Sequence, residues 1–102
     1  LTCGPIPPNP AELLNSRKME LVLEEALEQF DTIILDAPPV MAVTDAQLIA
    51  SKVDGTILVT SSGKTERDEI IKTKELLTKS KANLLGVILN NKPVDEKSYY
   101  YY

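Results

Sequence analysis

The sequence contains no histidine, and Cys3 is its single cysteine among 102 residues. Without histidine, the chain lacks the side chain that most often serves as a general base and as a metal ligand in proteins. One cysteine cannot form a disulfide within the chain, which makes a reducing compartment the simpler expectation. These absences argue against histidine-dependent catalysis and against a small domain stabilised by disulfides.

Long hydrophobic runs and an excess of positive charge are also missing. The apolar runs are a few residues long, whereas about 20 residues are needed to span a bilayer, and the first residues lack the pattern of a signal peptide. Eleven basic and fifteen acidic residues give a net charge of −4, which disfavours a nucleic-acid partner. With 43% hydrophobic and 25% charged residues, the composition is that of one soluble globular domain.

Helical and strand-like patterns alternate along the chain. Asn9, Pro10 and Ser16 are residues typical of helix starts, and apolar residues recur on one face from Met19 to Phe30. We expect helices over residues 10–16, from Ser16 to Phe30, from Thr44 to Ile49 and from Thr65 to about Lys79, the last with Ile70, Ile71, Lys74 and Leu77 on one side.

Residues 32–36, 55–60 and 84–89 form three apolar segments without alternation. Such segments are typical of strands that are buried on both faces of a parallel sheet. Helices that connect parallel strands form right-handed crossovers and pack on the sheet. The sequence therefore predicts an α/β fold, a three-layer parallel sheet with flanking helices.

Asp36 follows three large aliphatic residues at the carboxyl end of the first predicted strand, and two prolines come soon after it. In open parallel sheets, ligands bind beyond the carboxyl ends of the strands. A carboxylate in this place holds Mg²⁺ in P-loop NTPases, usually through a bound water. The alternative is that Asp36 caps the strand end or pairs with a lysine.

Residues 61–65 follow the second predicted strand and contain Gly-Lys-Thr, the end of a phosphate-binding loop. That loop requires a glycine five positions before Gly63, where this sequence has Leu58. The remaining residues supply too few backbone N–H groups to surround a phosphate. We interpret Thr65 as a helix cap and Lys64 as a solvated side chain.

Asn90 and Asn91 follow the third predicted strand. A side-chain amide both donates and accepts hydrogen bonds and can therefore contact the edge of a nucleotide base. Turn formation before Lys92 and Pro93 accounts for the two asparagines equally well.

All four tyrosines are the last four residues of the chain. A run of four aromatic residues would be an unusual core element, and the residues before it are polar. We expect a domain over residues 1–91 and a flexible tyrosine-rich tail over residues 92–102. A sticky edge strand is the structural alternative for the tail.

In residues 4–14, which contain Pro-Pro-Asn-Pro, and in residues 30–39, the sequence resembles the bacterial tyrosine kinases of capsular and exopolysaccharide assembly. Residues 44–46, 54–59 and 86–90 and the tyrosine tail fit the same family. The resemblance covers essentially the whole chain and implies a P-loop NTPase-like fold.

The resemblance implies an enzyme that transfers the γ-phosphoryl group of ATP to tyrosines in the tail of a neighbouring subunit. It matches Asp36 to the Walker B aspartate, which helps to hold Mg²⁺, and Asn90, more loosely, to an adenine contact. It also implies a ring-like homo-oligomer, protein substrates, and a cytoplasmic location at the inner face of the membrane through a membrane-embedded activator. The phosphate acceptors would be Tyr99, Tyr100, Tyr101 and Tyr102.

The family places its Walker A phosphate loop and its Walker A′ motif upstream of the segments matched here, and this sequence contains neither. The resemblance is therefore to the C-terminal part of a kinase domain, truncated on the N-terminal side. We expect that this chain alone neither binds ATP appreciably nor phosphorylates a protein, because phosphoryl transfer depends on groups that position the phosphates and neutralise their charge.

Two other functions stay open at the level of sequence. A deviant P-loop ATPase of the partitioning type shares the Asp-x-x-Pro pattern, although such proteins do not usually end in a run of tyrosines. A non-enzymatic α/β interaction module would bind a partner through the tail, and the absence of a complete catalytic site from the sequence is compatible with it.

Overall fold

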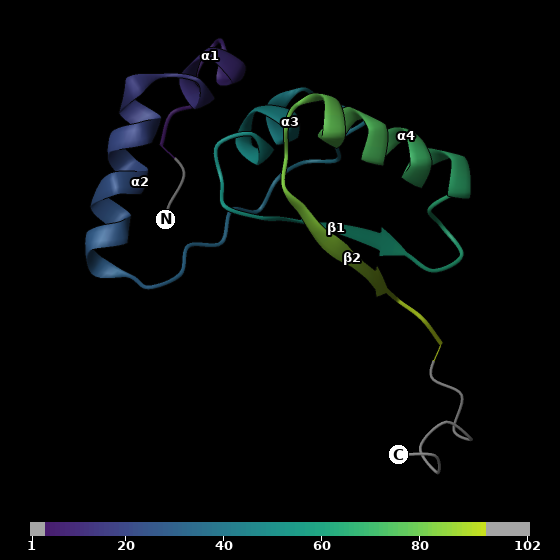
Figure 1. Cartoon of the computed structure of the whole chain (residues 1–102). Coiled ribbons are helices and arrows are strands. Elements are labelled where there is room, and N and C mark those ends of the chain that lie inside the picture. The colour runs from purple at the N-terminus through teal and green to yellow at the C-terminus, as the bar shows by residue number, and fades with distance from the viewer. Residues whose placement is uncertain (1–3, 94–102) are drawn as a thin grey trace.

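The computed structural model describes residues 4–93, so the predicted phosphate acceptors at positions 99–102 lie outside the described residues. The elements along the chain are α1 (Pro10–Leu14), α2 (Arg17–Gln29), α3 (Asp45–Ala50), β1 (Thr56–Ser61), α4 (Arg67–Lys79) and β2 (Leu84–Asn90) (Figure 1). Each predicted helix is present, and so are the second and third predicted strands. The predicted α/β class is confirmed.

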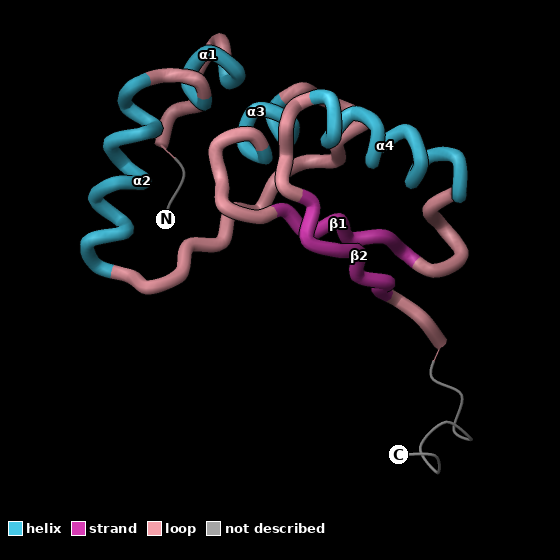
Figure 2. The backbone as a smooth tube through the Cα atoms, viewed as in Figure 1, coloured by secondary structure: helices cyan, strands magenta, loops and turns pink. Residues whose placement is uncertain are grey.

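The two strands form a parallel sheet, with Leu58 beside Val87 and Thr60 beside Leu89. The connection between them is α4, and α3 and α4 lie on the same side of the strands (Figure 2). Within this helical layer, Leu77 of α4 is the most deeply buried large side chain of the described residues, with 1% of its surface exposed. The other buried residues are Ala46, Ala50, Thr60 and Thr73.

The prediction that the strands are buried on both faces is wrong for this chain. On β1, Ile57 and Val59 keep 54% and 60% of their surface exposed, on the face opposite to the buried Thr60. Val87 and Ile88 on β2 are about half exposed as well. The physical reason is that the described residues supply a helical layer to one face of the sheet, so the apolar side chains on the other face have no cover.

The first predicted strand, at residues 32–36, is absent from the sheet. Within residues 4–93, the sheet has two strands, and residues 32–39 have no regular secondary structure. A strand is defined by the ladder of hydrogen bonds to its neighbour, and no described strand pairs with this segment. The predicted three-layer parallel sheet is therefore corrected to a two-stranded sheet with helices on one face.

One predicted helix cap is confirmed and another is wrong. Ser16 caps α2 as expected, since its hydroxyl accepts a hydrogen bond from the Met19 N–H at 3.4 Å. By contrast, α4 begins at Arg67, because the Thr65 hydroxyl accepts a hydrogen bond from the Ser61 N–H at 2.9 Å and does not cap the helix. The predicted cap at Thr65 is wrong, because the hydroxyl closes the preceding loop.

The buried side of α4 is also rotated from the one expected. Thr73 and Leu77 are buried and Ile70 is half-buried, whereas Ile71 and Lys74 are exposed. Ile70, Thr73 and Leu77 are separated by three and four residues and therefore share one helix face. The threonine, not the second isoleucine, faces the sheet because it lies on the stripe that contains Leu77.

The apolar face of α2 is formed but only partly covered, with Met19, Leu23 and Ala26 half-buried. Leu27 and Phe30 expose 60% and 62% of their surface. The helix is joined to the rest of the chain through α1 and through an ion pair between Lys52 Nζ and Glu20 Oε1 at 3.5 Å. No helix in residues 4–93 is long and apolar enough to cross a membrane.

Candidate functional site

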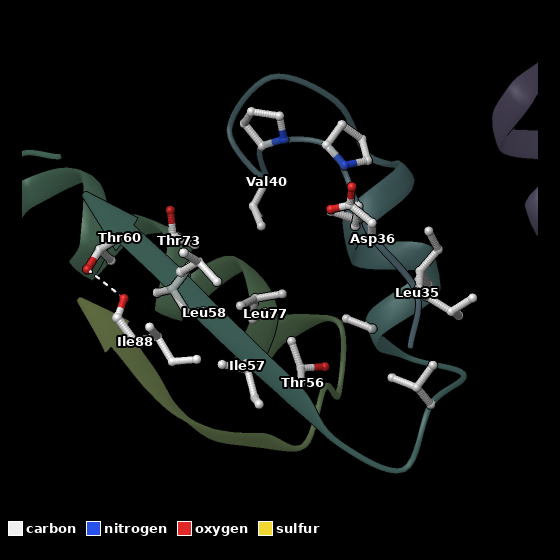
Figure 3. A pocket seen from close by; sticks show the side chains of 18 of the residues that line it. Leu35, Asp36, Val40, Thr56, Ile57, Leu58, Thr60, Thr73, Leu77 and Ile88 are labelled. Atoms are coloured by element: carbon white, nitrogen blue, oxygen red, sulfur yellow. Dashed lines mark hydrogen bonds between the residues drawn. The ribbon is translucent and has the colours of Figure 1, made fainter. Parts of the chain in front are cut away.

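A groove with a volume of about 940 Å³ runs between β1 and the irregular segment that precedes α3. One wall is β1 together with Thr73 and Leu77 of α4, and the opposite wall is formed by residues 33–41 (Figure 3). Its lining is mostly aliphatic. The groove contains the residues that the sequence placed at the end of the first strand, although that strand is not formed.

Asp36 lies on the wall of the groove opposite β1, next to Leu35 (Figure 3). Its side chain is exposed. Leu35 and Ile33 are half-buried, whereas Ile34 is 89% exposed. Ile33 and Leu35 are therefore the better covered residues of the segment, and Asp36 adds one exposed carboxylate to the groove wall.

The loop at residues 61–65 is closed by its own hydrogen bonds. The N–H groups of Lys64 and Thr65 donate to the Ser61 carbonyl at 3.2 and 3.0 Å, and the Ser62 N–H donates to the Asn90 carbonyl at 2.8 Å. The Ser61 N–H is held by the Thr65 hydroxyl. Because these backbone donors are already used within the protein, the loop does not fit a phosphate group.

Asn90 ends β2 and is exposed. Its Oδ1 accepts a hydrogen bond from the Asn91 N–H at 2.9 Å, and the Asn91 Nδ2 donates to Ser61 Oγ at 2.9 Å. Asn91 has a φ of 56°, a left-handed conformation that asparagine tolerates better than most residues. The side chain of Asn90 thus supports a turn in this structure, and Asn90 does not line the groove that contains Asp36.

The main charge cluster of the described residues lies on α2, away from the groove. Arg17 Nη1 contacts Glu20 Oε2 at 3.0 Å and Glu24 Oε1 at 3.4 Å. The hydrogen bond from Arg17, and then the charge of Lys52, hold the pKa of Glu20 below its ordinary value. The same hydrogen bond to Glu20, helped by the charge of Glu24, raises the pKa of Arg17.

The donor groups near the groove fit part of a magnesium site. Mg²⁺ is held in proteins by one or two carboxylates, with water and substrate phosphate oxygens completing its octahedron. Asp36 supplies one exposed carboxylate of this kind. Within residues 4–93, no group of three or more cysteine, aspartate or glutamate side chains gathers to hold a metal ion.

Two curated relatives match all 102 residues of the chain. The tyrosine-protein kinase YwqD of Bacillus subtilis is 50% identical, and the match takes in 43% of its length. The putative tyrosine-protein kinase CapB of Staphylococcus aureus is 45% identical, and the match takes in 45% of its length. Over its whole length, the chain is similar to bacterial tyrosine-protein kinases. The tyrosine-protein kinase etk of Escherichia coli K12 is 37% identical over 90 residues, and no family model matches the chain.

Two solved structures share the fold. The chimerical protein CapA2B2 has a TM-score of 0.85 and 44% sequence identity, over 92% of this chain and 42% of that protein. The kinase domain of VpsO has a TM-score of 0.83 and 34% identity, over 91% of this chain and 46% of that domain. The chain therefore spans less than half the length of each of these proteins.

Sequence reasoning found Asp36 and Asn90 but missed the groove. The structure places Asp36 on the groove wall and leaves Asn90 outside the lining, so it does not bring the two residues together. For Thr56, Ile57 and Val59 on the opposite wall, the sequence predicts a strand and no part in a groove. The signal that could have revealed them is that apolar and polar residues do not alternate along β1. A strand that is apolar on both faces needs cover on both, and this chain leaves one face open.

Proposed function

We propose that this chain is the C-terminal part of an ATP-dependent bacterial protein-tyrosine kinase that autophosphorylates its tyrosine-rich tail in trans. The observation that carries the proposal is the identity of 50% and 45% over all 102 residues to two proteins named as tyrosine-protein kinases. The tyrosines at positions 99–102 support it, because such an enzyme requires an acceptor side chain. The process it regulates is capsular or exopolysaccharide synthesis.

In this proposal Asp36 helps to hold Mg²⁺, Asn90 contacts adenine, and the four terminal tyrosines accept phosphate. The metal ion neutralises charge on the phosphates of ATP during transfer. The exposed carboxylate on the groove wall supports the role of Asp36. For Asn90 to contact a base, its Oδ1 would exchange the hydrogen bond from the Asn91 N–H for one from the ligand.

The proposed partners are further copies of the kinase in a ring, protein substrates, and a membrane-embedded activator that keeps the enzyme at the cytoplasmic face of the membrane. The chimerical neighbour CapA2B2, whose name combines CapA and CapB, supports a partnership between such a kinase and a second protein.

The function is tested in a chimera in which this chain replaces the matching part of B. subtilis YwqD. After incubation with ATP and Mg²⁺, we expect mass spectrometry to find phosphate on one or more of Tyr99, Tyr100, Tyr101 and Tyr102. The matched control changes all four to phenylalanine, which removes the acceptor oxygens and keeps the rings. A folded, ATP-binding chimera without phosphotyrosine in the tail would overturn the proposal.

A further inference from the structure

The carboxyl ends of β1 and β2 are joined by a side-chain hydrogen bond as well as by the sheet. Ser61, the last residue of β1, lies beside Asn90, the last residue of β2. The Ser62 N–H donates to the Asn90 carbonyl at 2.8 Å and so fixes the backbone of Asn90. One residue further along, Asn91 Nδ2 donates to Ser61 Oγ at 2.9 Å. The turn at residues 90–91 is therefore held against the end of β1.

Ser61 is a rigid anchor for this turn. Its N–H donates to the Thr65 hydroxyl at 2.9 Å, and its carbonyl accepts hydrogen bonds from the N–H groups of Lys64 and Thr65. Its backbone is thus held on both sides of the Cα atom. Because hydrogen bonds in such a network support one another, the Ser61 hydroxyl is a fixed acceptor for Asn91.

The conformation of Asn91 sets the orientation of the neighbouring amide of Asn90. Asn91 has a φ of 56°, a left-handed conformation that is unfavourable for most residues with a Cβ atom, and its hydrogen bond to Ser61 stabilises it. In this conformation the Asn91 N–H donates to Asn90 Oδ1 at 2.9 Å. Turning the amide of Asn90 over would bring two donors, its Nδ2 and the Asn91 N–H, together. The turn therefore selects one of the two orientations of the amide.

The orientation of a side-chain amide decides which base it fits, because its oxygen accepts hydrogen bonds and its nitrogen donates them. Adenine carries an amino donor at N6, where guanine carries the acceptor O6. A ligand group that replaces the Asn91 N–H at Asn90 Oδ1 must itself be a donor. The amino group of adenine meets this requirement, whereas O6 of guanine would repel Oδ1.

We propose that Ser61 and Asn91 are positioning residues that set the orientation of the Asn90 amide and thereby the preference of the nucleotide site for adenine over guanine. Neither residue needs to touch the nucleotide, since both act through the turn. The inference rests on the proposed contact between Asn90 and adenine, and it adds the residues that make this contact specific. A pair that only stabilised the turn would affect both nucleotides alike.

The dissociation constants of ATP and GTP with Mg²⁺, measured by calorimetry in the chimera with YwqD, test this inference. Asn91→Gly removes the amide, and glycine adopts the left-handed conformation without strain. Ser61→Ala removes the acceptor oxygen. We expect each variant to bind ATP about three- to tenfold more weakly, the usual effect of one lost hydrogen bond. Binding of GTP should change little, so the preference for ATP should fall by the same factor.

Three further variants serve as controls. Ser61→Thr keeps the hydroxyl and should retain the preference for ATP. Ser51→Ala removes a hydroxyl that donates to the Leu48 carbonyl at 2.7 Å, away from this turn, and should leave both dissociation constants unchanged. Ser61→Ala combined with Asn91→Gly should weaken ATP no more than either change alone, because both remove the same hydrogen bond.

The rate of tail phosphorylation gives a second readout. Saturating ATP compensates for weaker binding of the base, so the rate at saturation should fall by less than about twofold in Ser61→Ala and Asn91→Gly. A much larger fall at saturation, with unchanged dissociation constants, would contradict a role in base recognition.

The possible failures can be told apart. A chimera that binds neither nucleotide would overturn the proposed function itself. If Asn90→Ala leaves both dissociation constants unchanged, the adenine contact is wrong and the positioning role fails with it. If Asn90→Ala weakens ATP but Ser61→Ala and Asn91→Gly do not, the adenine contact stands and the positioning role alone is overturned. Equal weakening of ATP and GTP in these two variants, or equal binding of both nucleotides by the unaltered chimera, would also overturn the positioning role.

Discussion

At the scale of single residues, Glu20 shows how one carboxylate joins α2 to the rest of the chain. It receives a hydrogen bond from Arg17 on its own helix and pairs with Lys52 beyond α3. Because its pKa is lowered in the folded chain, its contribution to stability is present above its ordinary pKa of 4.5 and is lost as the pH falls through the depressed value. All of the participating side chains are at least partly exposed, so salt weakens the contribution.

We predict that Arg17→Gln raises the pKa of Glu20 more than Lys52→Gln does. The reason is that the hydrogen bond from Arg17 is the largest cause of the lowered value and the charge of Lys52 is the second. A pH titration of the Glu20 carboxyl carbon by NMR measures both shifts. Arg67→Gln, on the distant α4, is the control and should leave the Glu20 titration unchanged. A larger effect of Lys52→Gln would contradict the prediction.

The second residue-scale prediction concerns Asp36. In the chimera, Asp36→Asn keeps the size of the side chain and removes its charge, so we expect tail phosphorylation to fall by roughly 100-fold or more, as when a group that stabilises developing charge is lost. Phosphate on the tail tyrosines is quantified by mass spectrometry. Asp54→Asn is the matched control, since Asp54 is an exposed carboxylate that does not line the groove. Equal phosphorylation of the two variants would remove Asp36 from the proposed site.

At the scale of secondary-structure elements, α4 carries most of the packing. It connects the two strands and places Leu77 against the sheet, while its opposite side is exposed. The sequence pattern indicated the helix but grouped Ile71 with Ile70 and Leu77 on one side, because two adjacent isoleucines allow two stripes. Packing chose the stripe that contains Thr73 and Leu77, which leaves Ile71 outside.

We predict that Leu77→Ala lowers the free energy of unfolding by about 2–5 kcal/mol, the usual cost of a cavity at a fully buried leucine. Ile71→Ala, on the exposed side of the same helix, should cost less than about 1 kcal/mol. Urea unfolding, followed by circular dichroism, measures both changes. The chimera is used because a loss of about 2–5 kcal/mol can exceed the whole free energy of unfolding of a small chain. Similar costs for the two variants would show that α4 packs differently.

At the scale of the whole molecule, the described residues form an incomplete layer structure. One side of the sheet is covered by α3 and α4, while the other side, one edge of β1 and the apolar face of α2 are open. Two observations, the exposed apolar surface and the match to less than half of each relative, would have one explanation. Further chain, as in the longer relatives, would complete the core. The phosphate-binding groups that the proposed role of Asp36 requires would then come with that further chain.

We predict that the 102-residue chain gives no heat of ATP binding at micromolar concentrations in calorimetry, whereas the chimera with YwqD binds ATP with Mg²⁺. The physical reason is that the backbone N–H groups of Ser61, Ser62, Lys64 and Thr65 already donate hydrogen bonds within the loop or to β2. The titration of the chain alone is repeated with Asp36→Asn as a control for metal-dependent binding. Micromolar affinity in the unaltered chain would show that its own residues form a nucleotide site.

The sequence by itself determined the order of elements, because helix caps, helical periodicity and apolar strands are local patterns. It also indicated Asp36, since a carboxylate after three aliphatic residues needs no tertiary information to be noticed. It could not determine whether residues 32–36 are a strand, because a strand exists through its neighbour and none is described beside them. The tertiary structure decided that the Thr65 hydroxyl closes a loop, that Asn90 supports a turn, and that Asp36 shares a groove with the open edge of β1, since each of these depends on which distant groups meet.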